Sequence, residues 1–167
     1  MSQNFTSAGT SINKNKLPAI YRKLGKTIEG KSTLDYGCGR YVDHIREHLE
    51  SINCTPFFYD PYNRTEKQNS EWICTQCGYH AIDVAICSNV LNVIDDEKSI
   101  EKIIDILGYH AKEAYLTVYE GDKSGKGRQT GPDQYQRNEK AQKYLDRIVS
   151  MGYWAELRNG VIHMRMK

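Results

Sequence analysis

Thr33-Leu34-Asp35-Tyr36-Gly37-Cys38-Gly39-Arg40 is the stretch of the sequence that decides the fold. Its start is typical of a short strand. Its two glycines are typical of a tight turn, because glycine adopts positive φ and lets a backbone come close to a ligand. From about residue 41 to 51, apolar side chains recur at helical spacing. We therefore expect a strand, a glycine turn and a helix, with Asp35 pointing into the crevice where open α/β sheets bind ligands.

Two further strands are expected to end at the same edge of the sheet. Residues 55–59 are rich in aromatic side chains and are followed by Asp60, about 25 positions after Asp35, which fits one β-α-β unit. An acid at the end of the second strand of such a unit can accept hydrogen bonds from ribose hydroxyls. Residues 82–87 form an apolar run typical of a strand buried on both faces, with Ser88 and Asn89 after it.

The remaining elements complete an α/β fold of three layers. A helix begins at Asn13 or Asn15, a second begins after Asp95 and Asp96, and Asn159-Gly160 indicates a hairpin. The other expectations are a loop over 62–70, a short strand over 71–75, a strand over 114–119 and a last helix over 134–151. The result is a mostly parallel sheet that ends in a C-terminal antiparallel hairpin.

Composition predicts one globular domain. The chain has 167 residues, of which 39% are hydrophobic, and its net charge of +2 is too close to neutral to indicate nucleic acid by itself. Residues 1–12 lack periodicity and are expected to be a flexible arm before a single domain over 13–167. No apolar run approaches the roughly 20 residues of a membrane span, and the start does not look like a signal peptide, so we expect a cytoplasmic protein.

The five cysteines predict reduced thiols, since their number is odd. Cys74 and Cys77 form the one C-x-x-C pair, and His80 is the nearby third candidate ligand. A structural zinc usually needs a second pair of ligands, so we predict no metal and interpret the pair as two small thiols.

Residues 122–133 are expected to be a flexible basic loop that serves as a lid. This loop carries Lys123, Lys126 and Arg128 among several glycines. These side chains are candidates for substrate binding through phosphate, and a solvated loop is the alternative.

The glycine turn, Asp60 and the strand over 82–87 resemble the motifs of class I S-adenosylmethionine-dependent methyltransferases, which have a Rossmann-like fold. The segments 35–40, 59–62 and 89–96 more closely resemble methyltransferases found with DNA phosphorothioation systems and their phage relatives. The resemblance covers residues 33–120 well and the last helix loosely.

The resemblance implies S-adenosylmethionine as cofactor. It puts Asp35 near the methionine amino group and Asp60 on the ribose hydroxyls, although either acid can instead cap a turn. The backbone of the turn would contact the cofactor through Gly37, Cys38 and Gly39.

By the same resemblance Ser88 and Asn89 border the methionine and the transferable methyl group. Asn89 and Asn92 are then the candidates for catalysis, and an ordinary turn is the alternative for both.

The sequence does not assign the methyl acceptor. Tyr41 stands where the family motif has a third glycine, and neither the Asn-Pro-Pro-Tyr type of motif nor a Pro-Cys nucleophile is present. Nucleic acid, a nucleotide and a small molecule remain open as acceptors. A degenerate domain that binds a cofactor or partner without catalysis is the alternative function. Nicotinamide-dependent redox chemistry is disfavoured, because the glycine of its fingerprint in the following helix is missing.

Overall fold

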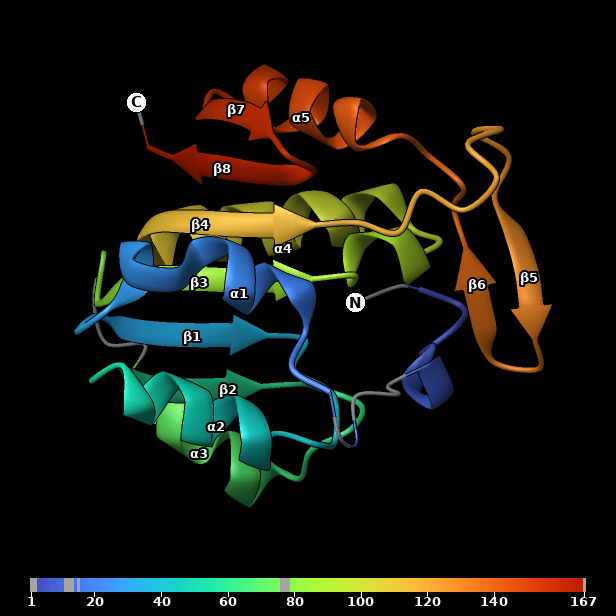
Figure 1. Ribbon diagram of the computed structural model, residues 1–167. Helices are drawn as coiled ribbons and strands as arrows, with labels where there is room; N and C mark the ends of the chain where they lie inside the picture. Colours follow the sequence, from blue (N-terminus) through green and yellow to red (C-terminus); the bar gives the residue numbers. More distant parts are fainter. Residues whose placement is uncertain (1–2, 11–13, 15, 76–78, 167) are drawn as a thin grey trace.

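The computed structural model describes residues 3–10, 14, 16–75 and 79–166, and contains a six-stranded sheet in the order β2-β1-β3-β4-β8-β7 (Figure 1). The strands are β1 (Ser32–Tyr36), β2 (Thr55–Tyr59), β3 (Ile82–Ser88), β4 (Ala111–Thr117), β7 (Trp154–Arg158) and β8 (Val161–Arg165). The first four in spatial order are parallel, while β8 is antiparallel to β4 and to β7. The predicted fold class is confirmed.

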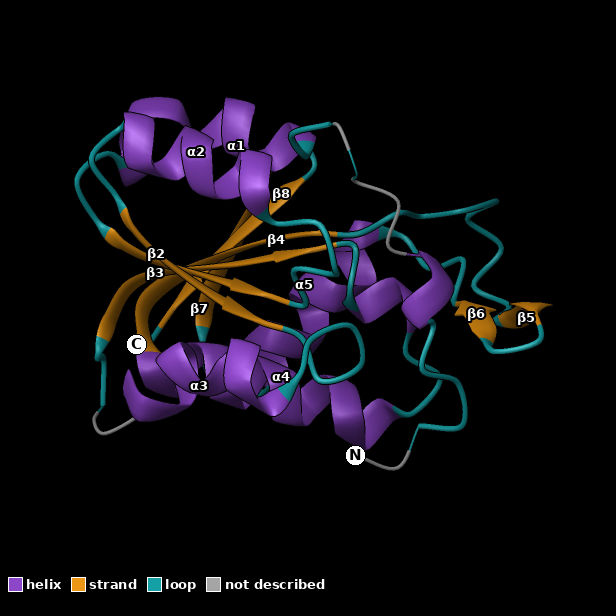
Figure 2. Ribbon diagram, turned by 90° about the horizontal axis from the view of Figure 1, so that it is seen from below, coloured by secondary structure: helices purple, strands orange, loops and turns teal. Residues whose placement is uncertain are grey.

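Helices cover both faces of the sheet (Figure 2). One face carries α1 (Ala19–Leu24) and α2 (Asp43–Ser51), and the other carries α3 (Glu66–Thr75), α4 (Glu97–His110) and α5 (Ala141–Ser150). Short 3-10 turns occur at η1 (Ala8–Thr10), η2 (Gly25–Ile28) and η3 (Leu91–Val93). Across the described segments, no helix combines the length and the apolarity that crossing a bilayer requires.

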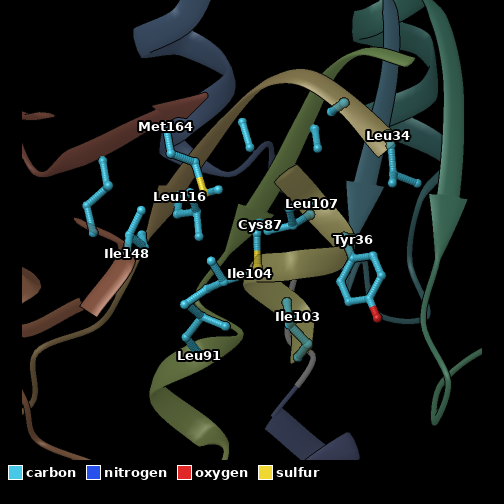
Figure 3. Packing of buried hydrophobic residues seen from close by; sticks show 14 of the residues in the cluster. Leu34, Tyr36, Cys87, Leu91, Ile103, Ile104, Leu107, Leu116, Ile148 and Met164 are labelled. Atoms are coloured by element: carbon cyan, nitrogen blue, oxygen red, sulfur yellow. The ribbon is translucent and has the colours of Figure 1, made fainter. Parts of the chain in front are cut away.

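Side chains alternate between the two faces, as the strand period of two requires. Leu34 and Tyr36 of β1 belong to the core beneath α4, whereas Ile86 of β3 and Phe58 of β2 pack with α1 and α2. Figure 3 shows the first of these cores, in which Cys87 lies fully buried between the sheet and α4. The thiol of Cys87 is thus a packing group, as the strand pattern predicts.

Local sequence signals explain where several elements begin and turn. The Asp96 carboxylate accepts a hydrogen bond from the Ser99 amide at 2.8 Å and caps α4, as predicted. Asn159 and Gly160 have φ values of 51° and 73°, the left-handed conformation that a two-residue turn needs to join β7 and β8.

Three expectations about secondary structure are wrong. Residues 66–75 form α3 rather than a loop followed by a strand. The last helix begins at Ala141, because residues 134–136 are strand β6, paired with β5 (Arg128–Gly131) in a separate two-stranded sheet. The first helix begins at Ala19 with Pro18 before it. Of the Cys74 and Cys77 pair, Cys77 lies outside the described residues, and so does the side chain of Cys74.

A buried ion pair explains why the predicted last helix starts late. Arg137 and Glu139 have side chains only 7% and 3% exposed, and their charged groups meet at 3.0 Å. The Arg137 guanidinium also donates to the Ile94 carbonyl at 3.1 Å, and the Arg137 amide donates to the Asn92 carbonyl at 2.9 Å. These bonds keep the segment around Arg137 extended next to η3. The buried charges of Arg137 and Glu139 need hydrogen-bonding partners, and a helix on the surface would not provide them.

We predict that Arg137→Met lowers the free energy of unfolding by about 3 kcal/mol, since it leaves the Glu139 carboxylate buried with one partner fewer. Lys143 still reaches Glu139 at 2.5 Å, which keeps the loss at the lower end of the usual range. Arg158→Met, which removes a surface pair with Glu156, is the control and should cost under about 1 kcal/mol. Urea unfolding measures both, and equal losses would contradict the prediction.

Candidate functional site

A cavity of about 950 Å³ lies at the carboxyl ends of the parallel strands. In Figure 1 the arrowheads of β1 and β4 point toward the side of the molecule where the N-terminal segment and the β5–β6 hairpin lie. The cavity is lined by Gln3, Thr6, Ser7, Thr10, Tyr36, Gly37, Cys38, Gly39, Asp60, Pro61, Tyr62, Asn63, Ser88, Asn89, Val90, Asn92, Val93, Ile94, Ile103, Val118, Tyr119, Gly121, Asp122, Arg128, Thr130, Tyr135, Gln136 and Asn138. The structure therefore brings most of the predicted site residues together.

The glycine turn is tied to the end of β2. The amides of Gly37 and Cys38 both donate to the Tyr59 carbonyl, at 2.7 and 3.2 Å, and the Gly39 amide donates to Asp60 Oδ2 at 2.9 Å. Both glycines have positive φ, 78° and 73°. The turn thus presents a fixed wall to the cavity, with its three N–H groups engaged within the protein.

The Asp60 carboxylate is buried, with 6% of the residue exposed. Besides the Gly39 amide, it accepts hydrogen bonds from the amides of Tyr62 and Asn63, at 2.9 and 2.8 Å, on Oδ1. The Asn63 side chain makes two longer contacts with it, both at 3.3 Å. Asp60 therefore organises the loop after β2, which is the turn-capping alternative, and also lines the cavity.

Asp35 is the exception among the predicted cofactor-binding residues. It is 3% exposed, is absent from the cavity wall, and lies on the sheet face toward α1, beside Tyr21. Burial raises the pKa of the Asp35 carboxyl to about 7, with a smaller opposing effect of the Tyr21 hydroxyl. Because strand side chains alternate, the two neighbours of Asp35 point to the other face. Asp35 therefore faces α1 rather than the crevice.

Ser88 and Asn89 lie at the centre of the cavity edge, between the ends of β1 and β4. The Ser88 hydroxyl is 3.1 Å from the Thr117 hydroxyl, and the backbone N–H of Asn89 donates to the Thr117 carbonyl at 2.8 Å. Asn89 has a φ of 57° and an exposed side chain. The exposed side-chain amide of Asn89 is therefore available to a ligand.

Asn92 has a different environment. It is only 2% exposed, its amide nitrogen donates to Gln136 Oε1 at 3.2 Å, and its oxygen accepts from the Tyr119 amide at 3.3 Å. These bonds use both ends of the side chain to join η3, the segment after β4, and β6.

The three basic candidates have different surroundings. Arg128 lines the large cavity, while Lys123 forms a 2.9 Å ion pair with Glu120 and lines a second cavity of about 450 Å³. Lys126 is exposed and lines neither cavity. The expected loop is partly ordered, since Arg128 begins strand β5.

The arm that the sequence predicts to be flexible has defined contacts over residues 3–10. The Asn4 side chain donates to Asp95 at 2.6 Å, the Thr6 amide donates to Asp133 at 2.8 Å, and the Phe5 ring stacks on Tyr135 with centroids 5.7 Å apart. This segment therefore forms one wall of the cavity. The serine, threonine and asparagine content of the arm is the one sequence signal for this role, and it is equally typical of a loop.

Gln136 and Asn138 are cavity residues that the sequence analysis missed. They are 9% and 1% exposed, and their amides donate to the carbonyls of Tyr119 and Lys126, each at 2.9 Å. The sequence predicted a helix over residues 134–151, so these two side chains were not expected in the wall of the cavity.

Tyr41, in contrast, does not line the cavity, and its ring lies 6.0 Å from the Arg40 guanidinium. Within the described ranges, no group of three or more potential metal ligands gathers.

The chain matches no known family model and no curated protein sequence. A solved structure does match it: the magnesium protoporphyrin IX methyltransferase of Synechocystis PCC 6803, solved with bound S-adenosylmethionine. The alignment covers 100% of this chain and 86% of that one, with a TM-score of 0.56 and 14% sequence identity. The chain has the Rossmann-like methyltransferase fold.

Two further methyltransferase structures resemble this chain more loosely. An S-adenosylmethionine-dependent methyltransferase from Aquifex aeolicus has a TM-score of 0.46 at 12% identity, with 90% of this chain and 97% of that chain covered. A possible histamine N-methyltransferase from Thermotoga maritima has a TM-score of 0.45 at 10% identity, with 87% and 90% covered.

We predict that Gly37→Ala costs about 2–5 kcal/mol of unfolding free energy, because it combines strain at positive φ with overpacking. A Cβ at Gly37 would lie 2.3 Å from Val90 Cγ2. Gly30→Ala is the matched control: its φ of 72° is similar, nothing lies within 4 Å, and the cost should be about 1–2 kcal/mol. Urea unfolding compares them, and equal losses would show that Val90 does not constrain the turn.

We predict that Asp35→Asn removes a pH dependence of stability. An unfolded Asp ionises near pH 4, whereas burial raises the pKa of Asp35 to about 7, so the folded state binds the extra proton between these values. The unfolding free energy of the parent should therefore fall as pH rises through this window, by on the order of 3 kcal/mol between about pH 5 and about pH 8. Urea unfolding at about pH 5 and about pH 8 tests this, and the same fall in the variant would refute it.

Proposed function

We propose that this protein transfers a methyl group from S-adenosylmethionine to an acceptor. The proposal depends on one observation. In a methyltransferase fold, the glycine turn, Asp60, Ser88 and Asn89 all line the same cavity. Open α/β sheets bind ligands at this edge, and the cavity volume is at the upper end of the range for ligand pockets.

The residues around Asp60 fit the ribose of such a cofactor. A carboxylate accepts about four hydrogen bonds, and the two contacts from the Asn63 side chain are long, at 3.3 Å. A ribose hydroxyl can replace them without disturbing the shorter bond from the Gly39 amide. Asp60 would thus bind the ribose while it keeps the glycine turn in place.

Bound there, S-adenosylmethionine supplies a methyl group on a cationic sulfur, which an acceptor lone pair takes as the carbon–sulfur bond breaks. The protein's task is then to orient the acceptor and exclude water. Asn89, with its exposed amide beside Ser88, is the candidate for contact with the reacting groups. Asn92 supports the frame instead, since both ends of its amide are engaged.

The acceptor class to test first is a nucleic acid or nucleotide. Its support is the motif resemblance to methyltransferases of DNA phosphorothioation systems, together with Arg128 in the cavity wall. Arginine is suited to phosphate because its planar fork offers two parallel donors.

We predict that the parent protein binds S-adenosylhomocysteine in isothermal titration calorimetry and that Asp60→Asn weakens binding roughly 10- to 100-fold. A hydrogen bond to a charged group contributes about 1.5–3 kcal/mol, which corresponds to that factor. Asp146→Asn, on the exposed side of α5, is the control and should bind as the parent does. Thermal unfolding of the ligand-free variants checks that Asp60→Asn is folded.

The absence of binding by the folded parent would end the proposal. Incubation with labelled S-adenosylmethionine and DNA, RNA or mononucleotides then separates an enzyme from a domain that only binds. Transfer of label to any of them excludes the binding-only alternative.

A further inference from the structure

Tyr119 has a fixed backbone and a free ring. Its amide donates to Asn92 Oδ1 at 3.3 Å, and its carbonyl accepts from the Gln136 side chain at 2.9 Å. The residue is nevertheless 63% exposed, the highest fraction among the large apolar and aromatic side chains that the described structure leaves exposed. The backbone of Tyr119 is thus fixed at the cavity wall, and most of its side chain is open to a ligand.

The support beneath Tyr119 is unusually specific. Asn92 and Gln136 are buried and are bonded to each other at 3.2 Å, so two buried amides share the task of fixing one exposed residue. Buried polar groups are costly unless every one is hydrogen-bonded. Such a network fixes the point at which the Tyr119 side chain leaves the backbone. This favours stacking of the ring on a ligand, because loop mobility would otherwise move that point.

Tyr119 lies where the two cavities meet. The cavities of about 950 and 450 Å³ share the wall residues Ser88, Asn89, Val118, Tyr119 and Gly121. In the proposed function Ser88 and Asn89 border the transferable methyl group. A ring at this junction is therefore next to the point of transfer, on the β4 side, away from the Asp60 loop.

Arg128 supplies charge in the same cavity. The other charged wall residues of the described chain are engaged: Asp60 in the glycine turn, and Asp122 with the Ser124 amide at 2.9 Å. Arg128 pairs with Gln136 through the backbone of the β5–β6 sheet. Its guanidinium makes no hydrogen bond or ion pair with the described residues and has only a through-space interaction with Asp122. Its guanidinium therefore has donors to offer a ligand anion.

We infer that Tyr119 and Arg128 form the acceptor subsite and that the acceptor combines a planar aromatic ring with a phosphate, the chemistry of a nucleotide. The ring stacks on Tyr119 and the phosphate pairs with Arg128. This inference takes the identity of the transferred methyl group from the proposed function. The existence of a nucleotide-binding subsite does not depend on that function. A free mononucleotide and a single-stranded nucleic acid share this chemistry.

The test is calorimetric titration of the protein saturated with S-adenosylhomocysteine. The probes are the four ribonucleoside 5′-monophosphates, their nucleosides, inorganic phosphate and a short single-stranded oligonucleotide. We expect at least one monophosphate to bind roughly tenfold more tightly than its nucleoside, and Arg128→Gln to abolish that difference. Lys126→Gln, two positions away and outside both cavities, is the matched control and should retain it.

Tyr119 is tested with the same probes. Tyr119→Leu should weaken nucleoside and nucleotide alike by roughly tenfold, and Tyr119→Phe should retain binding, because stacking needs the ring and not the hydroxyl. Both variants should bind S-adenosylhomocysteine as the parent does. Binding by the oligonucleotide alone, lost in the same variants, supports the subsite and identifies a polymer as its source.

Three results would overturn the inference. These are no binding by any nucleotide or oligonucleotide, equal effects of Arg128→Gln and Lys126→Gln, and binding of inorganic phosphate as tight as that of the best nucleotide. Failure of S-adenosylhomocysteine to bind refutes the proposed function instead. In that case the titrations are repeated without it and still test the subsite.

Discussion

The hydrogen bond from the Gly39 amide to the Asp60 carboxylate is the constraint on which the cavity depends. It acts together with the Tyr59 carbonyl, which accepts from Gly37 and Cys38, so the whole glycine turn is fastened to the end of β2. Without these bonds, a turn with two residues at positive φ would have three N–H groups to satisfy elsewhere. The same carboxylate also fixes the loop that follows it, so one side chain positions two walls of the cavity.

The opposite wall depends on a different kind of interaction. There the chain after β4 is held by buried amides and by the Arg137 and Glu139 pair, which together join η3, β6 and the segment before α5. The Asp60 side of the cavity is built from backbone groups near in sequence to the strands, whereas this side is built from side chains that reach across the fold. This division matches the proposed roles, with the ribose-binding side at Asp60 and the acceptor side at Tyr119 and Arg128.

The arm over residues 3–10 connects the two walls. Asp95, before α4, and Asp133, in the β5–β6 turn, both accept hydrogen bonds from it. These carboxylates are far apart in sequence. By sequence alone, each is typical of an acid at a helix start or in a turn, and neither indicates a contact with the arm. The cavity is therefore enclosed by three segments that no local pattern relates to one another.

The sequence alone determined the succession of the main strands along the chain, the glycine turn, the cap at Asp96 and the closing hairpin at Asn159-Gly160, because each depends on neighbouring residues and on backbone conformation. It also indicated Gly37, Asp60, Ser88 and Asn89 as residues of one sheet edge. Tertiary structure decided that the Asp35 side chain faces α1 and that Gln136 and Asn138 line the cavity. It also decided that Arg128, of the three basic candidates, reaches the large cavity. These outcomes rest on burial and on partners distant along the chain, which local periodicity does not encode.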